Sequence, residues 1–425
     1  MTERIINLLK EDPMVSDYRI NTINTESYEL FFVHRALETV RSTDTVSRKV
    51  TVFVEKDGLL GDATFSVYAS YTDEDIRREI ESACKKAALA GNEPYAIPEN
   101  ETLIRESDSN FKNYNTADLA ASIAEAVFAA DSEEGGSINA LEVFLYRDTV
   151  SVKNSRGIDK TEVRYHAMVE AIPTWNGAEE SVELYECHNF TEFDASAVTS
   201  EIATRMREVR DRLEATVPKM KLNCPVVLGA PELAELVYTL AHELNYAGAY
   251  NHTAAFQVGD DIQKGAVGDR LNVTLCGAVK GSVQSAAFDA DGTTLIDTEV
   301  IRDGCAVNSF GSARYASYLG KKPTGNLGCM RVEMGSFGDK DLKRAPYFRC
   351  ASMSGLQLDV YNDYIGGEVR LAYYFDGERE IPLTGISISG KLSDALASMR
   401  LSDASTVYEG YFGPCWASFD GIEII

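Results

Sequence analysis

Apolar positions in the first 215 residues alternate between helical and strand-like spacing. Residues 4–12 and 26–42 have helical spacing. A period-two alternation with Gly-containing turns then predicts a β-hairpin over residues 50–69. The next apolar stripe has helical spacing and begins with a capping box, in which Asp75 follows Thr72 by three residues. The pattern therefore predicts a mixture of helices and antiparallel strands.

The rest of this half repeats the mixture. Polar residues and two prolines over residues 92–115 predict a surface excursion, and a turn is expected over DSEEGG at 131–136. The further elements that we expect are a helix over 116–130, strands over 138–146, 149–154 and 162–175, and a charged helix over 195–215. This order predicts a layered α+β architecture rather than a parallel doubly wound sheet.

The pattern changes after Cys224-Pro225, and we predict a domain boundary within 217–224. A short strand over 226–228 leads into a helix from Pro231 to about Asn245. Short alternating segments separated by glycines follow, and only residues 309–319 and 391–399 have helical spacing there. We predict an α+β domain over 1–220 and a mostly-β domain over 221–425, the second a curved sheet or partial barrel.

Charge excludes two classes of partner. The 425 residues carry 66 acidic and 41 basic side chains, a net charge of −25. Such a surface repels phosphate backbones and anionic lipids, so we expect neither nucleic acid nor membrane as a partner. The chain starts without a secretory pattern and has no membrane-spanning apolar run, which predicts a cytoplasmic protein. The excess charge is −17 over residues 1–220 and −8 over the remainder.

Cysteine and nucleotide motifs indicate no chemistry. The eight cysteines include no C-x-x-C pair, which argues against zinc ribbons and thioredoxin-like sites. Cys187 and His188 are adjacent, and on a strand their side chains would point to opposite faces. The segment GISISGK at 385–391 lacks the P-loop hydroxyl, because Leu392 follows it.

The most suggestive histidine is His242, which is followed by Glu243. An HExxH motif would need histidine at Tyr246, and an HExxxH motif would need it at Ala247. The residues alone leave two interpretations. His242 is a histidine at a helix end beside a solvated glutamate, or it belongs to a metal site that recruits other ligands, such as His252.

Five blocks in the right order resemble the TldD/PmbA family, whose members are often labelled modulators of DNA gyrase. They are VSVKNSRG at 150–157, the passage from 195 to 242, AFDADGTTLIDTEVIRDG at 287–304, SARYASYLGKKPTGNLG at 312–328, and the segment 366–398. The residues that match the family motifs are Asn154, Ser155, Gly157, Asp289, Gly292, Gly304, Arg314, Thr324, Gly325 and Asn326.

The resemblance implies a dimeric two-domain protein related to a metallopeptidase. TldD-type subunits carry HExxxH and a cysteine ligand, whereas PmbA-type (TldE-type) subunits lack them. Because Ala247 replaces the second histidine, this chain resembles the PmbA kind, with His242 and Glu243 as vestigial candidates. The resemblance then implies no metal or other cofactor in this chain, and zinc only in a TldD-like partner. The stretch DVYND at 359–363 departs from the PmbA pattern.

The expected function is therefore that of a non-catalytic subunit of a cytoplasmic metalloprotease that acts on unfolded or extended peptides. It would form a heterodimer with a TldD-like subunit or a homodimer. Two alternatives are a self-sufficient zinc hydrolase with atypical ligands and a homodimeric peptide-binding scaffold without catalysis. We also expect the less charged second half to hold the dimer contact and the peptide groove.

Overall fold

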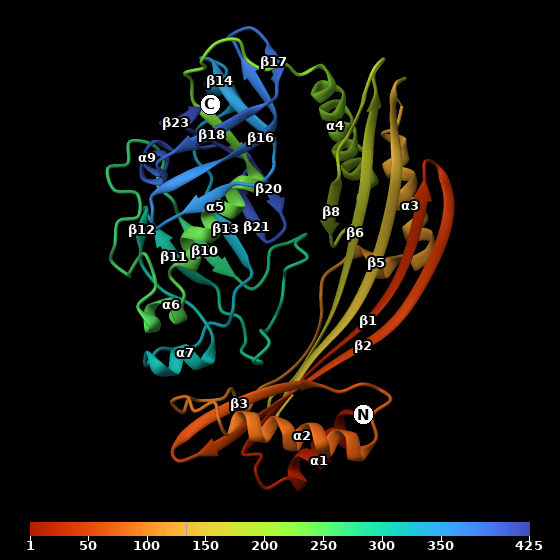
Figure 1. Cartoon of the computed structure of the whole chain (residues 1–425), viewed down its shortest axis with the longest axis vertical. Coiled ribbons are helices and arrows are strands. Elements are labelled where there is room, and N and C mark those ends of the chain that lie inside the picture. Colours follow the sequence, from red (N-terminus) through yellow and green to blue (C-terminus); the bar gives the residue numbers. More distant parts are fainter. Residues whose placement is uncertain (133) are drawn as a thin grey trace.

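The computed structural model describes residues 1–132 and 134–425 and shows an α+β chain in two parts (Figure 1). A long curved sheet with helices forms the first part, and a more compact, mostly-β body forms the second. The expected fold class is confirmed. In the described ranges, no helix is long and apolar enough to cross a membrane.

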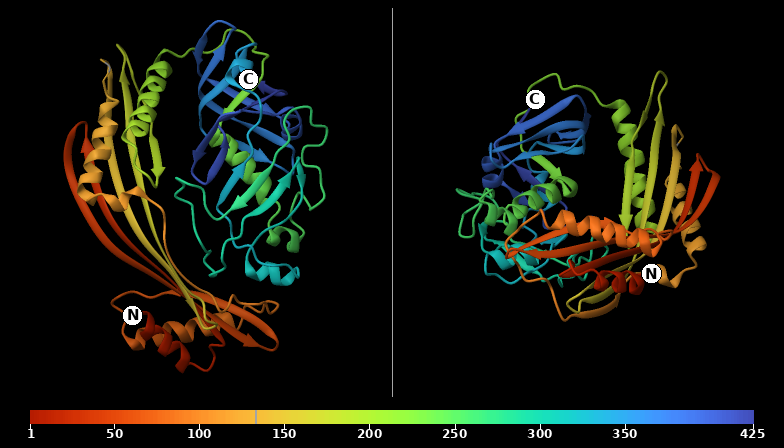
Figure 2. Two further views of the ribbon diagram at one scale, coloured as in Figure 1. Left: turned by 180° about the vertical axis from the view of Figure 1, so that it is seen from behind. Right: turned by 60° about the horizontal axis from the view of Figure 1, so that its bottom comes forward.

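The sheet of the first part is a curled half-barrel of long antiparallel strands (Figures 1 and 2). Its strand order is β3-β2-β1-β5-β6-β4, and two short strands, β7 and β8, pair with the later part of β6. The strand bounds are β1 Asp17–Val33, β2 Ala36–Lys56, β3 Leu59–Ser66, β4 Thr102–Glu106, β5 Gly136–Asn154, β6 Asp159–Asn176, β7 Ser181–Glu183 and β8 Glu186–Phe190.

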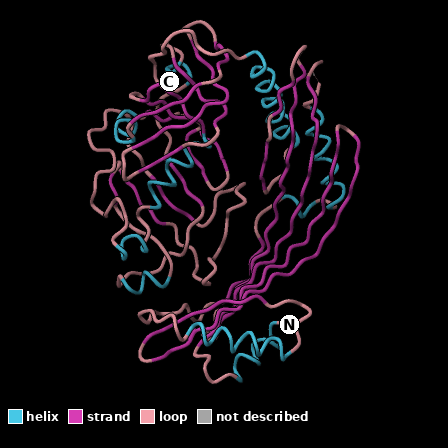
Figure 3. The backbone as a smooth tube through the Cα atoms, in the orientation of Figure 1, coloured by secondary structure: helices cyan, strands magenta, loops and turns pink. Residues whose placement is uncertain are grey.

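Two hydrophobic cores share this one sheet. The helices α1 (Thr2–Glu11) and α2 (Asp73–Ala87) pack on its lower end, and the predicted capping box of α2 is present. The helices α3 (Thr116–Ala129) and α4 (Ala195–Glu214) pack on its upper end. The strands run without a break from one core to the other (Figure 3).

The helix expected over 26–42 is wrong. These residues form the end of β1, a turn at His34 and the start of β2. Their side chains suit either a helix or a strand, and tertiary pairing decides between them. Strand β1 pairs with β5 along nearly its whole length, and His34 adopts a positive φ of 50° to close the hairpin.

Other expectations for the first part need smaller corrections. The surface excursion contains β4 and a 3₁₀ helix, Asn110–Asn113. The strands expected over 138–146 and 149–154 are one continuous strand, β5. The turn expected over 131–136 includes position 133, which lies outside the described residues. The helices expected over 4–12, after the Thr72 capping box, over 116–130 and over 195–215 are confirmed.

Two sheets enclose the helix α5 (Ala230–His242) in the second part. One has the order β12-β11-β10-β13-β21-β20, and the other β19-β22-β9-β14-β16-β18-β23, with β15 and β17 on β16. Leu233, Leu236 and Leu240 of α5 lie in a core to which both sheets contribute. The helix is amphipathic, because the remaining stripe, which includes Glu235, Tyr238 and His242, is exposed.

The strands of this part are short, as the glycine-rich pattern predicts. Their bounds are β9 Val226–Gly229, β10 Val273–Cys276, β11 Thr298–Arg302, β12 Cys305–Ala306, β13 Cys329–Val332, β14 Tyr347–Met353, β15 Gln357–Asp359, β16 Tyr364–Phe375, β17 Glu380–Leu383, β18 Ile386–Gly390, β19 Arg400–Leu401, β20 Ser405–Tyr408, β21 Tyr411–Pro414, β22 Trp416–Phe419 and β23 Ile422–Ile424.

The helices of the second part are shorter than expected. The helix expected to reach Asn245 ends at His242, and a separate helix α6 covers Tyr246–Asn251. Helix α7 covers only Ala313–Tyr318 of the segment expected over 309–319, and α9 spans Leu392–Ser398. The short helix α8, Asp339–Leu342, lies where no helix was expected.

Candidate functional site

The end of α5 places His242 and Glu243 at a break between two helices. Helix α5 ends at His242, and Asn245 starts α6 by accepting a hydrogen bond from the Ala247 amide at 2.7 Å. Positions 242 and 247 therefore lie on different helices. His242 is exposed, and its ring stacks on Tyr238 with centroids 5.6 Å apart.

Glu243 is held by its neighbours. Its Oε2 accepts a hydrogen bond from the Ala255 amide at 2.6 Å. The Tyr361 hydroxyl lies 3.0 Å from the same oxygen and 2.6 Å from the carbonyl oxygen of Thr253. The hydrogen bond to Glu243 raises the pKa of Tyr361. Tyr361 belongs to DVYND, so the stretch that departs from the PmbA pattern contacts the vestigial motif.

These residues do not fit a zinc ion. A zinc site needs at least three protein ligands, and the break between α5 and α6 separates the two positions that would supply the motif's histidines. Among residues 1–132 and 134–425, no group of three or more His, Cys, Asp or Glu side chains is arranged to hold a metal. We therefore derive no chemical step through a metal in this chain.

The Asn-Ser-x-Gly motif forms the turn between β5 and β6. The Asn154 side-chain oxygen accepts hydrogen bonds from the amides of Arg156 and Ile158, both at 2.9 Å. Ser155 donates to Asp17 Oδ1 at 2.6 Å and accepts from the Tyr18 amide at 3.1 Å. These contacts fix the turn against the start of β1.

Asp289 organises the facing loop of the second part. Its Oδ1 accepts hydrogen bonds from the amides of Asp291 and Thr293 at 2.9 and 3.0 Å. Its Oδ2 accepts from the amide of Asn326 at 3.1 Å. Burial, followed by the charge of Asp291, raises the pKa of Asp289. Asp289 thus joins two motif blocks that are far apart in the sequence.

We call the contact between the 154–158 turn, the 287–296 loop and residues 324–326 the motif junction. Two motif glycines allow these segments to approach closely there. A Cβ on Gly292 (φ +85°) would lie 2.8 Å from Cγ2 of Ile158 in the other part. A Cβ on Gly325 (φ +77°) would lie 2.4 Å from Cδ2 of Leu295. The side-chain oxygen of Thr324 accepts from the Gly311 amide at 3.0 Å.

Charged and apolar contacts connect the two parts at the junction. Arg19 on β1 forms an ion pair with Asp291, and Phe288 packs in a buried cluster with Val152 and Ile158. Arg19 was not among the residues predicted from the sequence. Its sequence signal was weak, because arginine is common at the start of a strand. Only the fold brings Arg19 to the opposite loop.

Two of the remaining motif residues lie outside the motif junction. Gly304 closes the hairpin between β11 and β12 with φ +66°. Arg314 on α7 lies over the rings of Tyr95, Tyr315 and Tyr318, each 5.7–5.8 Å from its guanidinium carbon. Tyr95 belongs to the first part, so Arg314 forms a second contact between the parts. Gly157 lies within the motif turn itself and packs against Asn100.

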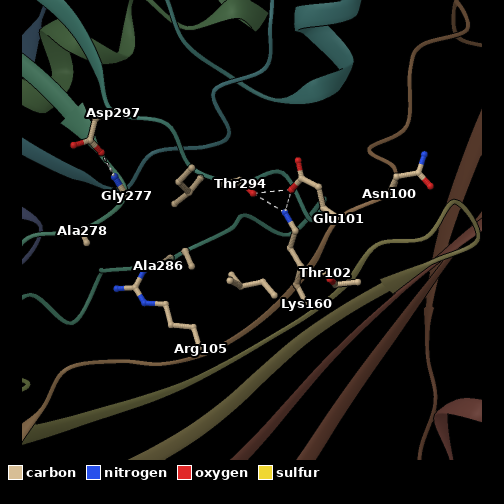
Figure 4. Close-up of a pocket in the computed structure, with 13 residues that line it drawn as sticks. Asn100, Glu101, Thr102, Arg105, Lys160, Gly277, Ala278, Ala286, Thr294 and Asp297 are labelled. Carbon is tan, nitrogen blue, oxygen red and sulfur yellow. Dashed lines mark hydrogen bonds and ion pairs between the residues drawn. The ribbon is translucent and has the colours of Figure 1, made fainter.

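A pocket of about 590 Å³ opens beside the motif junction, between β4 and β6 of the first part and segments 277–297 of the second (Figure 4). Lys160 is only 1% exposed; it pairs with Glu101 and donates to Thr294 Oγ1 at 2.7 Å. An adjoining pocket of about 470 Å³ shares Arg105 and Ala278 with it. Together the two pockets form a groove, which we call the inter-part groove.

The groove lies along the edge strand β4. Among the described strands β4 pairs only with β6, and Ile104 is 92% exposed. Such an edge presents unpaired backbone groups to which an extended chain can add as a strand. Sequence reasoning missed this site, because it assigned residues 92–115 to a surface excursion.

Comparisons with a family model and with solved structures agree with the observed fold. Residues 221–424 match the family model of the PmbA/TldA metallopeptidase C-terminal domain. The structure of TldE from Thermococcus kodakarensis matches with a TM-score of 0.81 at 15% identity, over 100% of this chain and 99% of that chain. Comparison with curated protein sequences finds no match.

Two further solved structures share the fold over the whole chain. A Thermotoga maritima protein, named as a proposed modulator of a DNA gyrase, has a TM-score of 0.75 at 14% identity, over 100% of this chain and 99% of that chain. A Bacteroides thetaiotaomicron protein with a similar name has a TM-score of 0.78 at 13% identity, over 100% and 97%.

Proposed function

Since this chain belongs to the TldD/PmbA family, we propose that it is a TldE-like, non-catalytic subunit of a cytoplasmic metallopeptidase. The proposal assigns the zinc and the hydrolysis to a TldD-like partner with an intact HExxxH. It assigns to this chain the holding of an unfolded or extended peptide and the contact with that partner.

One observation carries the non-catalytic assignment, namely the break between α5 and α6. His242 faces solvent on one helix, Ala247 lies on the next, and Glu243 is bound by Ala255 and Tyr361. A general base needs a free carboxylate close to a metal-bound water. A carboxylate that already holds a loop amide and a tyrosine is poorly suited to that role.

The inter-part groove supports the peptide-holding role. The edge of β4 offers backbone hydrogen bonds, which recognise an extended chain with little preference for its sequence. A folded protein would be excluded because its backbone groups are already paired. The net charge of −25 opposes the alternative of direct DNA binding.

Elemental analysis and a peptidase assay test the proposal. We expect the purified chain to contain no stoichiometric zinc and to leave an unfolded peptide uncut, whereas a mixture with a TldD-like subunit cuts it. His242→Ala in this chain should leave the activity of the mixture unchanged. The matched control removes the first histidine of the partner's HExxxH and should abolish activity.

Two outcomes would contradict the proposal. One zinc per chain and cleavage by the chain alone, lost on His242→Ala, would establish a self-sufficient hydrolase. A chain that neither binds a TldD-like subunit nor changes its activity would favour a peptide-binding scaffold.

A further inference from the structure

A pocket in the first part lies where the long sheet meets the start of α3. Its volume is about 510 Å³, which is within the range of small-molecule sites. Strands β1, β2, β5 and β6 contribute its floor, and the 3₁₀ helix Asn110–Asn113 and the first turn of α3 contribute its wall. Among the described residues that line it, only Tyr165 also lines the inter-part groove. The pocket is therefore a separate site.

The position of the pocket follows from the two cores that share the sheet. On β1, Ile20 belongs to the lower core and Leu30 to the upper core. They are an even number of residues apart, so both cores lie on the same face of the sheet. Between them this face carries Thr22, Asn24 and Glu26, whose side chains are not buried. Because the pocket contains both Glu26 and residues of the upper core, it joins a polar surface to an apolar one.

A row of charged side chains crosses three strands in this pocket. Glu26 on β1 is paired in register with Asp44 on β2 and with Arg147 on β5. Residues directly opposite each other on antiparallel strands have Cβ atoms about 5 Å apart and point to the same face. Arg147 forms an ion pair with Glu26 at 2.8 Å, whereas Asp44 has no ion-pair partner among the described residues. The row thus has two carboxylates and one guanidinium, an excess of one negative charge.

The neighbouring row of the sheet and the wall above it are apolar and aromatic. Tyr28 on β1 lies opposite Leu145 on β5, and Leu145 is buried. The wall contributes Phe111 and Leu119, which are buried, and Tyr114, which is 44% exposed. Aromatic rings attract another ring through edge or offset contacts, and they attract a cation over the ring face. The pocket therefore places an aromatic lining next to the excess negative charge.

The lining contains one further basic residue, Lys112 of the 3₁₀ helix. Its side chain is exposed, and in the described part of the chain it forms no ion pair. A lysine ammonium on a flexible stem remains in solvent at little cost. The carboxylates of Glu26 and Asp44, in contrast, are kept close together by strand pairing, and like charges directly opposite each other destabilise a sheet. The row of charges therefore favours a cationic ligand over an anionic one.

We propose that this pocket binds a ligand that carries a primary ammonium group on an aromatic body. The ammonium group lies at Asp44 and Glu26, and the ring packs against Tyr28, Phe111 and Tyr114. An ammonium group donates three hydrogen bonds, so it can bind both carboxylates at once. The site goes beyond the proposed function, and it does not depend on a catalytic partner or on the inter-part groove.

Ligand-observed NMR titrations of the full-length chain at physiological salt test the charge preference. Phenethylamine and phenylpropanoate have the same aromatic body and opposite charges. We expect the amine to bind at least about tenfold more tightly than the carboxylate. A peptide that begins with phenylalanine distinguishes two sources of the ligand. Equal or tighter binding of this peptide would identify a peptide end, weaker binding would identify a small amine, and both results support the proposed chemistry.

Three variants locate the binding, because a net charge of −25 attracts any cation. Asp44→Asn should weaken amine binding about tenfold, since it removes a charge-assisted hydrogen bond. The matched control Asp57→Asn removes the same charge from the exposed turn after β2, outside the pocket, and should leave binding unchanged. Tyr114→Ala should weaken binding about threefold through loss of the ring contact.

Three results would overturn the proposal. The first is that the amine does not bind, and the second is that the carboxylate binds as tightly as the amine. The third is that Asp44→Asn and Asp57→Asn weaken binding equally, because the amine would then be held by the general charge of the chain. Asp44 and Tyr114 are both exposed, so their variants should fold and keep the test decisive.

Discussion

The motif junction and the end of α5 both carry residues that match the TldD/PmbA pattern, and the structure uses them differently. At the junction, Asp289 accepts three backbone hydrogen bonds, and Gly292 and Gly325 permit contacts that a side chain would block. At the end of α5, His242 faces solvent and stacks on one tyrosine.

The difference shows that the recognisable motifs of this chain mainly connect its two parts. Turns and loops that must approach closely need particular glycines, asparagines and aspartates, so these leave a clear sequence pattern. A metal site would need the second histidine, which is absent. The residues of this chain that match the family motifs therefore indicate its architecture more directly than its chemistry.

The largest expected effect is at the junction. Gly325→Ala adds a Cβ that would lie 2.4 Å from Leu295 Cδ2, at a backbone φ of +77°. We expect a loss of about 3 kcal/mol in the free energy of unfolding, measured by urea denaturation. The control Gly320→Ala has φ +63° and open space around the Cβ, so it should cost only about 1 kcal/mol. Equal losses in the two variants would mean that the close contact with Leu295 adds nothing to the cost of Gly325→Ala.

A pH experiment probes a buried contact within the first part, between β8 and α4. Burial raises the pKa of Glu186 to about 7, although Arg205 opposes the shift. The folded state then binds a proton more tightly than the unfolded state, whose pKa is about 4.3. This group's contribution to the free energy of unfolding should fall by about 2 kcal/mol as pH rises from about 4 to 7.

Glu186→Gln should remove that decrease relative to the unmodified chain, in urea denaturation at a series of pH values. The control Glu201→Gln changes another carboxylate that pairs with Arg205. The Glu201 side chain is 44% exposed, so this variant should keep the decrease. If the free energy of unfolding of both variants depends on pH in the same way, the burial of Glu186 does not cause the decrease.

The smallest effects are expected at the end of α5. Glu243→Ala removes the acceptor of the Ala255 amide and of Tyr361, and should cost about 1 kcal/mol in thermal or urea unfolding. His242→Ala should change stability by less than about 0.5 kcal/mol, because its side chain is exposed. A larger cost for His242 than for Glu243 would reverse the comparison between the two regions.

Local patterns predicted those elements whose signals lie within them. The Thr72 and Asp75 capping box starts α2, and the glycines of the second part separate short strands, as expected. The stretch 26–42 was not predicted: residues 26–33 pair with β5, more than a hundred residues away, and residues 36–42 take strand conformation by pairing with β1. Strand β4 was not predicted for the same reason, since its pairing with β6 is also non-local.

The candidate site was predictable only in part. The motif residues could be found from the sequence, and the absence of a histidine at Ala247 is visible there. That Asp289 would bind the amide of Asn326, or that Tyr361 would bind Glu243, depends on loops meeting in three dimensions. Lys160 and Arg19 carry no local signal, because a buried or paired cation cannot be recognised without its partner.

The shared sheet has a consequence for synthesis of the chain. The hairpin of β1 and β2 is complete at Lys56, whereas β5, which covers the other edge of β1, begins only at Gly136. Roughly eighty residues must leave the ribosome in between, which takes about 4–16 s at ordinary elongation rates. During that interval β1 has one edge without a partner, and β3 covers β2 only from Lys49 to Lys56, so the nascent chain is most exposed to aggregation, and most in need of a chaperone, before β5 emerges.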